Sequence, residues 1–203
     1  MKDLKGFLIN MATPEPIIDL RNLEIRKKKR VWKPFMEKYD CQIICELGVF
    51  EGENFDLMIE HKPKTAVAVD AWLDDGIASR NDSGYAQDTL DKQYQSFASR
   101  MADKPFVKIY REYTFKAVSH FPDEYFDLIY IDADHTYKGC LKDIEDWYPK
   151  VKKGKFLIGD DYREASAQRT GVKFGVIEAV NSFTQDNNLK VYELPRYGWA
   201  IIK

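Results

Sequence analysis

The sequence predicts an α/β fold in which seven strands form a mostly parallel sheet, helices cover both faces, and a C-terminal antiparallel hairpin closes one edge. Three observations support this prediction. Short apolar runs alternate with helical patterns, a glycine-rich turn follows the first apolar run, and the last two apolar runs adjoin. The length of 203 residues suits one domain over 1–203. We expect an N-terminal helical cap at 1–40 and a ligand-binding core at 41–203.

Apolar residues at helical spacing predict a helix over residues 22–39, ahead of the first strand. A run of five cations at 26–30 lies inside it, and we interpret this run as a solvated helix face. The same spacing predicts the remaining helices at 54–60, 88–101, 115–121, 141–148 and 172–183.

Apolar runs bounded by turn residues predict the strands at 43–45, 66–69, 106–110, 126–131, 156–158, 191–194 and 199–202. A helix separates each of the first five strands from the next, so we expect these strands to be parallel. Only Pro195, Arg196, Tyr197 and Gly198 separate the last two, which therefore form the predicted hairpin.

The stretch at 41–52, CQIICELGVFEG, predicts a ligand site. Its strand ends in Glu46, and Gly48 and Gly52 then allow a sharp turn and a close approach of a ligand to the main chain. The following helix start offers unpaired N–H groups. The second strand ends in Asp70, and this pattern is typical of a nucleotide-type pocket. The G-x-x-x-G spacing differs from the dinucleotide fingerprint G-x-G-x-x-G.

Two more acidic groups follow later strands, with Asp132 and Asp134 after one and Asp160 and Asp161 after the next. The carboxyl ends of parallel strands share one edge, so we expect these acids beside the glycine-rich turn. Crowded carboxylates raise each other's pKa, which indicates a cationic ligand or an oxygen-bound divalent ion. In the alternative interpretation, the acids cap helices or line a solvated rim, and Asp134 is well placed to cap the helix near Tyr137.

The motif Glu46-x-Gly48-x-x-x-Gly52 resembles the first motif of class I S-adenosylmethionine-dependent methyltransferases, which have a Rossmann-like sheet. The segments at 126–135, 143–150 and 159–162 resemble small bacterial O-methyltransferases of sugars and antibiotics, relatives of the catechol-type enzymes. The resemblance covers 43–162 and extends more loosely to 203. It departs from the family at Lys155, where relatives often have glycine, and at Asp160, where the small bacterial group often has histidine. It implies S-adenosylmethionine contacts at Glu46, Gly48, Val49, Phe50, Gly52, Asp70, Ala71, Trp72, Thr114 and Asp132.

The same resemblance implies a metal site and a catalytic base. Asp132, Asp160 and Asp161 match the metal-ligand positions of the catechol-type relatives, with Mg²⁺ as the candidate ion. His135 falls where those relatives place a catalytic lysine, and its ordinary pKa of about 6.5 suits proton transfer near neutrality. Asp134 is the competing base, and a hydrogen-bonded helix-start role for His135 stays open.

These observations predict an S-adenosylmethionine-dependent methyltransferase that modifies a small-molecule hydroxyl on a sugar, phenol or natural product, with or without Mg²⁺. The first alternative is an NAD(P)-binding Rossmann oxidoreductase, which the missing dinucleotide fingerprint disfavours. The second is a methyltransferase for a nitrogen or macromolecular acceptor, although residues 132–135 lack an Asn/Asp-Pro-Pro-Tyr motif. The third is a non-catalytic partner protein that keeps the pocket.

Bulk properties limit the partners and the location. The net charge of −2 gives no general attraction to nucleic acid, and no apolar run approaches the roughly 20 residues that span a bilayer. We therefore expect neither nucleic acid nor membrane as a partner. The three cysteines lack a C-x-x-C spacing, and we find no signal-peptide pattern, so we expect a cytoplasmic location. The N-terminal helix or the final hairpin could pair two copies as a homodimer.

Overall fold

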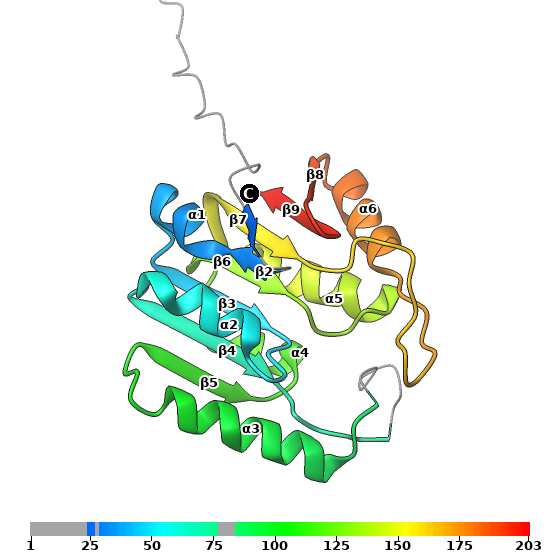
Figure 1. Cartoon of the computed structure of the whole chain (residues 1–203). Coiled ribbons are helices and arrows are strands. Elements are labelled where there is room, and N and C mark those ends of the chain that lie inside the picture. Colours follow the sequence, from blue (N-terminus) through cyan, green and yellow to red (C-terminus); the bar gives the residue numbers. More distant parts are fainter. Residues whose placement is uncertain (1–23, 27–28, 77–83) are drawn as a thin grey trace, which may run out of the picture.

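A computed structural model describes residues 24–26, 29–76 and 84–203 of the chain (Figure 1). The strands of the main sheet are β3 (Ile43–Leu47), β4 (Thr65–Asp70), β5 (Val107–Arg111), β6 (Phe126–Ile131), β7 (Val151–Gly159), β8 (Val191–Leu194) and β9 (Gly198–Ile202). They form a seven-stranded sheet in the order β5-β4-β3-β6-β7-β9-β8. The sheet confirms the predicted fold class.

Strand direction within the sheet also agrees with the sequence. β3 pairs in parallel with both β4 and β6, β4 pairs in parallel with β5, and β6 pairs in parallel with β7. β9 is antiparallel to β7 and β8, which confirms the hairpin. The chain leaves β3 toward one side of the sheet and returns to β6 on the other. Such a switch point opens a crevice at the carboxyl ends of the strands, where ligands bind in folds of this type.

Within the described residues, six α-helices cover the two faces of the sheet: α1 (Trp32–Lys38), α2 (Glu53–Met58), α3 (Gln87–Met101), α4 (Thr114–Ala117), α5 (Tyr137–Trp147) and α6 (Val176–Asp186). Alternate strand residues point to opposite faces. On β3, Ile44 packs with α1, α2 and α3, whereas Cys45 and Leu47 pack with α4, α5 and α6. Figure 1 shows the resulting three layers.

The N-terminal prediction of one helix over 22–39 is wrong. The described part holds a two-stranded antiparallel ribbon of β1 (Glu24–Arg26) and β2 (Lys29–Val31), and only α1 is helical. In a helix, the five cations at 26–30 would place like charges three and four residues apart on one face, which is unfavourable. An extended backbone sends successive side chains to opposite faces instead. The rest of the predicted cap, at 1–23, lies outside the described residues.

Helix ends differ from the sequence predictions where local caps decide them. α5 begins four residues before the predicted 141, because the Thr136 hydroxyl accepts a hydrogen bond from the Gly139 N–H (3.1 Å) and caps the helix. α6 begins at Val176 rather than 172, after Ser166 and Lys173 have paired as an isolated bridge. The predicted helix at 115–121 is a single α-turn followed by the 3-10 helix Val118–His120.

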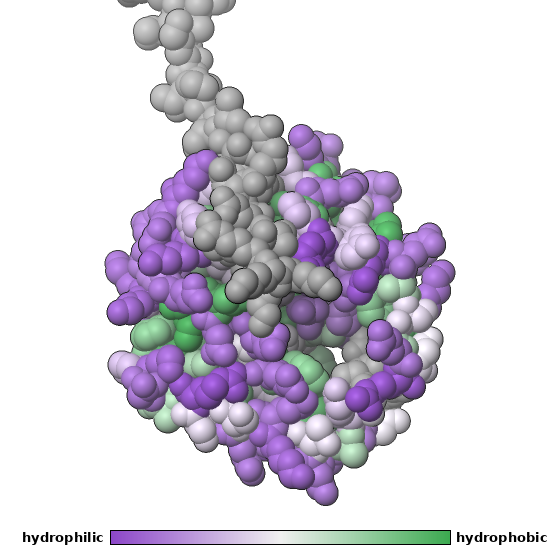
Figure 2. All heavy atoms as spheres, in the orientation of Figure 1, coloured by the Kyte–Doolittle hydropathy of each residue, from purple (hydrophilic) through white to green (hydrophobic). Residues whose placement is uncertain are grey.

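Two surface and core features bear on the partner and location predictions. Hydrophilic residues dominate the visible face of the molecule, with smaller hydrophobic areas between them (Figure 2). Within the described ranges, no helix is both long and apolar enough to cross a bilayer.

Cys41, Cys45 and Cys140 are buried free thiols. Burial raises the pKa of Cys41 to about 12, so this thiol is protonated and unreactive at neutral pH.

Candidate active site

A cavity of about 1210 Å³ lies at the carboxyl ends of β3, β4, β5 and β6. Its walls are the glycine-rich turn after β3 and the loops that follow the other three strands. All ten positions that the sequence suggested for cofactor contact line it: Glu46, Gly48, Val49, Phe50, Gly52, Asp70, Ala71, Trp72, Thr114 and Asp132. His135 and Asp134 line the same cavity. The topology therefore brings together residues that lie far apart in the chain.

The glycine-rich turn depends on its two glycines. Gly48 has φ 81°, and a Cβ there would lie 2.0 Å from the carbonyl oxygen of Asp132. Gly52 has φ 79°, and a Cβ there would lie 2.4 Å from the ring of Phe97. A side chain at either position would meet both backbone strain and a clash. The glycines thus let the β3 turn lie directly against the β6 loop and α3.

Asp70, at the end of β4, holds two loops in place. The Phe50 N–H donates to its Oδ2 (2.8 Å), and the Trp72 N–H donates to its Oδ1 (2.7 Å). Both donors belong to residues with positive φ, 53° at Phe50 and 42° at Trp72. Burial raises the pKa of Asp70, although the backbone donors oppose the shift. A carboxylate offers about four lone-pair sites, so these backbone donors leave it capacity to accept from a ligand hydroxyl.

Glu46 has an exposed fraction of only 2% and offers an unpartnered oxygen. Its Oε1 accepts from the Asn54 side-chain amide (3.0 Å), and the carbonyl of that amide accepts from the Trp32 indole (2.7 Å). Among the described residues, its Oε2 is buried and has no hydrogen-bond partner. Burial raises the pKa of Glu46 well above its usual value. The sequence analysis missed Asn54, because no residue pattern marks a side chain that only orients another.

Two further predicted cofactor contacts, Trp72 and Thr114, make different interactions at the cavity wall. The Trp72 ring is 1% exposed, its indole N–H donates to the Phe50 carbonyl (2.9 Å), and it packs on Phe97. Through this hydrogen bond, Trp72 stabilises the backbone of the glycine-rich turn. Thr114 begins α4, and its hydroxyl donates to Asp143 of α5. Asp143 was part of the quoted resemblance without a role, and it also lines the cavity.

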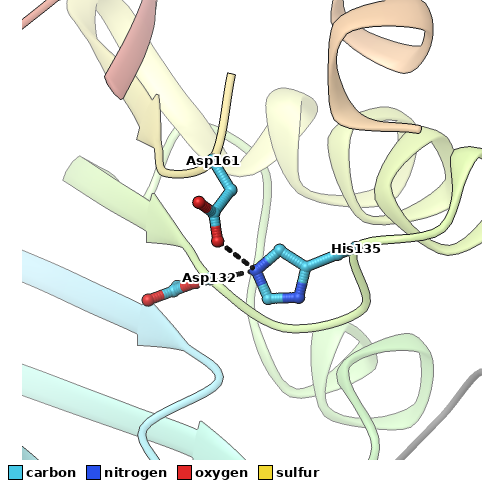
Figure 3. Close-up of side chains that lie close together, drawn as sticks. All are labelled: Asp132, His135 and Asp161. Atoms are coloured by element: carbon cyan, nitrogen blue, oxygen red, sulfur yellow. Dashed lines mark hydrogen bonds and ion pairs between the residues drawn. The ribbon is translucent and has the colours of Figure 1, made fainter. Parts of the chain in front are cut away.

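At the other end of the site, three side chains converge (Figure 3). The His135 Nε2 lies 3.1 Å from Asp132 Oδ1 and 3.2 Å from Asp161 Oδ2. The imidazole stacks on the Phe174 ring, with centroids 4.5 Å apart. Ionised carboxylates only accept hydrogen bonds, so a nitrogen that faces two of them is a favourable place for a proton or a metal ion. The cluster has the donor atoms that a cation site needs.

Within the cluster, the pKa values of Asp132 and Asp161 shift in opposite directions. Burial raises the pKa of Asp132, and it outweighs the hydrogen bond and charge of His135. For Asp161, burial acts in the same direction but is overcome by His135 and by the Arg163 guanidinium, so the pKa of Asp161 lies below its usual value. The Arg163 Nε donates to Asp161 Oδ1 at 2.7 Å. The pKa values of Asp132 and Asp161 are thus shifted in opposite directions.

Asp160 lies apart from this cluster, so the expected ligand set changes. The ligand atoms that come within 4.8 Å of one another belong to Asp132, His135 and Asp161. The Asp160 Oδ2 instead accepts from the Tyr130 hydroxyl (3.0 Å), and its Oδ1 accepts from the Asp161 N–H (2.9 Å). Asp161 adopts φ 54°, and its side chain contacts His135. A resemblance between motifs could not reveal this contact.

Asp134 stabilises the loop that carries His135. Its Oδ1 accepts from the Thr136 N–H (2.8 Å), one residue before α5 begins. A Cβ at Gly139 would lie 2.0 Å from the Asp134 carboxyl carbon, so this glycine makes room for the carboxylate. These contacts place Asp134 near the helix start, as the alternative interpretation expected, and also at the cavity wall.

The lining of the cavity is strongly acidic. The lining contains two lysines and one histidine but seven acidic residues: Glu46, Glu51, Glu53, Asp70, Asp132, Asp134 and Asp143. A lining with more acidic than basic side chains favours a cationic ligand over the pyrophosphate of a dinucleotide.

Comparisons with known proteins agree with this geometry. In sequence, 131 residues of the chain are 28% identical to "Uncharacterized protein R132" of Acanthamoeba polyphaga mimivirus, covering 63% of the chain and 54% of the relative. The match thus spans about half of that relative's length.

Three solved structures share the fold. The O-methyltransferase NovP is 15% identical with a TM-score of 0.60, covering 85% of this chain and 76% of that one. The Bacillus cereus O-methyltransferase in complex with SAH is 14% identical with a TM-score of 0.52, covering 85% and 79%. The SAH-bound Podospora anserina methyltransferase PaMTH1 is 13% identical with a TM-score of 0.55, covering 84% and 75%.

A family model described as a methyltransferase domain matches residues 45–162, which is more than half of the chain and includes the glycine-rich turn, Asp70 and the cluster. This chain therefore belongs to the methyltransferase domain family.

Proposed function

We propose that this chain transfers the methyl group of S-adenosylmethionine to a hydroxyl of a small molecule. One observation carries the proposal: ten separately suggested contact positions line one acidic cavity, and one of them, Glu46, presents a buried and unpartnered oxygen. S-adenosylmethionine has a sulfonium and an ammonium, which match that wall. The family membership supports the same chemistry.

The cofactor's parts find distinct partners along the cavity. The Glu46 Oε2 accepts from the ammonium of the methionine portion, which also removes the cost of leaving this carboxylate oxygen unsatisfied. Asp70 accepts from a ribose hydroxyl with the lone-pair capacity that its backbone donors leave. Gly48 allows the cofactor to lie close to the main chain. In this arrangement the sulfonium would lie near the β6 loop and Asp132.

Methyl transfer then proceeds by in-line displacement. A lone pair of the acceptor oxygen forms a bond to the methyl carbon, the carbon–sulfur bond breaks, and its electron pair returns to sulfur to give a neutral thioether. The acceptor proton passes to the Nε2 of a neutral His135. Asp132 and Asp161 then stabilise the protonated imidazole, in the arrangement that the 3.1 and 3.2 Å separations describe. Positioning and exclusion of water supply the rest of the catalysis.

The same three groups also fit a divalent metal ion. Neighbouring ligands at about 2.1 Å from a metal lie about 3 Å apart when they subtend a right angle, and the Asp132–His135 and His135–Asp161 pairs meet this condition. One imidazole with two carboxylates suits Mn²⁺, Fe²⁺ or Zn²⁺ better than Mg²⁺. When bound, such an ion lowers the pKa of a hydroxyl that it coordinates. Because metal and proton use the same nitrogen lone pair, His135 serves one role at a time.

A transfer assay tests the proposal. The protein is incubated with S-adenosylmethionine labelled on the methyl group and with panels of sugars, phenols and hydroxylated natural products, in EDTA or with Mn²⁺ or Mg²⁺. Label in a hydroxyl compound supports O-methylation, and activity in EDTA supports His135 as the base. A parallel panel of amines, peptides and nucleic acid is offered as well, and label only in that panel would contradict the proposal and favour the second alternative. Activity that requires added Mn²⁺ would assign the cluster to the metal.

The oxidoreductase alternative is less well supported, because the family model and the acidic cavity both point elsewhere. The division at residue 40, the homodimer, the cytoplasmic location and the lack of nucleic-acid and membrane partners stay predictions from the sequence.

A further inference from the structure

The loop between β7 and α6, residues 163–175, is folded as a strap beside the cavity. Its two arms pair through an antiparallel bridge between Ser166 and Lys173. At its base, the Phe174 ring stacks on His135 with centroids 4.5 Å apart, and His135 lines the cavity. Figure 1 shows the strap extending from β7 and α6 toward the segment that follows β4. The base of the strap therefore adjoins the imidazole that the proposed reaction uses.

The tip of the strap reaches the other end of the cavity through two aromatic rings. The Arg169 guanidinium lies over the Tyr85 ring, 4.1 Å from its centroid, and the Tyr85 ring packs on Phe50 with centroids 5.3 Å apart. Phe50 belongs to the glycine-rich turn and lines the cavity. A Cβ at Gly84 would lie 3.0 Å from the Arg169 Cβ, so the tip packs closely on this segment. The strap thus adjoins both ends of the cavity.

The strap carries two arginines, and both lie on tyrosine rings, but they differ in their acidic partners. Arg163 lies over Tyr197, and its Nε donates to Asp161 Oδ1 (2.7 Å). The Arg169 guanidinium makes no hydrogen bond or ion pair with any residue that the structure describes, and it contacts the Tyr85 ring alone. Stacking covers the face of a guanidinium and leaves the N–H donors at its edge available. Arg169 therefore presents a positioned but unused fork of donors.

The distribution of charge indicates which ligand this fork would bind. The cavity lining contains seven acidic residues, so a negatively charged group on an acceptor is disfavoured along that wall. The same group finds an opposite charge at the tip of the strap. The planar fork of an arginine matches the two oxygens of a carboxylate. One guanidinium balances one negative charge, which fits a carboxylate better than a phosphate dianion.

The length of the strap limits the size of the acceptor. This step depends on the proposed function, which places the methylated hydroxyl at His135. Arg169 precedes Phe174 by five residues, so the Cα atoms of these two residues lie at most about 18 Å apart. A single small molecule can span such a distance, with its hydroxyl at His135 and a charged group at Arg169.

We propose that Arg169 is a specificity-determining residue that binds a carboxylate of the acceptor, so that hydroxylated carboxylic acids are preferred over neutral alcohols and phenols. Tyr85 supplies the ring on which the guanidinium is held.

Methyl-transfer kinetics with matched pairs of acceptors test this proposal. The pairs are phenolic acids whose carboxylate lies one to four carbons from the ring, and glucuronic acid, each beside its own methyl ester. The wild type should favour the best acid over its ester by at least about tenfold in kcat/KM, mainly through KM, because the ester cannot accept a charge-assisted hydrogen bond pair. Arg169→Gln should raise the KM for that acid by at least about tenfold, with kcat and the ester almost unchanged.

Three controls accompany this variant. Arg169→Lys keeps the charge but loses the fork, so its preference for the acid should lie between those of the wild type and Arg169→Gln. Lys173→Gln removes an exposed cation of the same strap and should change the ratio of acid to ester by less than about twofold. Calorimetric titration should give the same dissociation constant for S-adenosylhomocysteine in the wild type and in Arg169→Gln.

Several results would overturn the inference. Equal losses for acid and ester in Arg169→Gln would mean that Arg169 only holds the strap in place, and equal losses of preference in Lys173→Gln would assign the effect to the general charge of the strap. Weaker binding of S-adenosylhomocysteine by Arg169→Gln would assign the guanidinium to the cofactor. If Arg169→Gln does not fold, judged by its melting curve, Arg169→Lys decides by the same ratio.

The proposed function can survive the failure of this inference. Transfer to esters and other neutral hydroxyl compounds, with none to the acids, would overturn the role of Arg169 and leave the proposed O-methylation intact. A wild type that neither binds S-adenosylhomocysteine nor methylates any hydroxyl compound would overturn the proposed function itself, and this inference with it.

Discussion

The two ends of the cavity are built in different ways. At the cofactor end, main-chain contacts fix the geometry: Asp70 accepts from two backbone N–H groups, and Gly48 lies directly against the Asp132 carbonyl. At the cluster end, side chains from two loops hold each other, with His135 between Asp132 and Asp161 and against Phe174. The comparison teaches that the proposed cofactor site is shaped by the main chain of the fold, whereas the proposed chemistry depends on loop side chains.

The largest effect should come from adding a side chain at Gly48, where the β3 turn lies against the Asp132 carbonyl. Gly48→Ala places a methyl group 2.0 Å from a backbone oxygen, so we expect loss of cofactor binding and destabilisation of about 3 kcal/mol or more. Gly154→Ala is the matched control, because Gly154 has a similar φ of 72° but nothing within 4 Å of its Cβ. It should cost only about 1 kcal/mol, the backbone strain alone.

Urea unfolding of both variants, followed by titration with S-adenosylhomocysteine, measures these effects. Equal stability and equal binding in the two alanine variants would show that the close approach of β3 and β6 does not shape the site.

The next effect separates the two ends. His135→Gln should lower methyl transfer by about 10²- to 10⁴-fold, because the proton acceptor is lost, while cofactor affinity changes little. His120→Gln is the control, since His120 lies outside the cavity lining and pairs with Glu112. Single-turnover rates and calorimetry measure transfer and binding separately. A large loss of affinity in His135→Gln would mean that the two ends are not independent.

The smallest effect is the dependence of stability on pH. Burial raises the pKa of Asp143 from an unfolded value near 4 to about 7, so its stabilising contribution is complete below about pH 4 and is lost as the pH rises to about 7. Glu46, Asp70 and Asp132 shift in the same direction. The cofactor-free protein should therefore melt at a lower temperature at pH 8 than at pH 5.

Differential scanning calorimetry of the wild type and of Asp143→Asn checks this expectation. Between pH 5 and pH 8 the free energy of unfolding should fall less for the variant than for the wild type. The difference should be at most about 4 kcal/mol. Identical pH slopes in both proteins would show that Asp143 titrates normally in the folded state.

The same contrast between the two ends explains which site residues could be predicted from the sequence. Glu46, Asp70 and Asp132 end parallel strands or directly follow them, and the topology of such a sheet brings strand ends to one edge. Those positions were therefore predictable. The replacement of Asp160 by His135 in the cluster was not, because it depends on the φ of 54° at Asp161 and on the Tyr130 hydroxyl. Asn54 and Asp143 were also missed, since each acts through a partner distant in sequence.

The N-terminal error has a related cause. Helical spacing of apolar residues predicted one helix over 22–39, yet the described residues 24–26 and 29–31 pair as two antiparallel strands. Strand pairing outweighed the local helical pattern.

The central claim, that the acidic cavity binds a cationic methyl donor, is tested most directly by calorimetric titration with S-adenosylmethionine and with NADH. We predict a dissociation constant of about 1–100 μM for S-adenosylmethionine, at least tenfold weaker binding by Glu46→Gln, unchanged binding by the exposed Glu60→Gln, and no heat with NADH. Binding of NADH with no heat from S-adenosylmethionine would contradict the account.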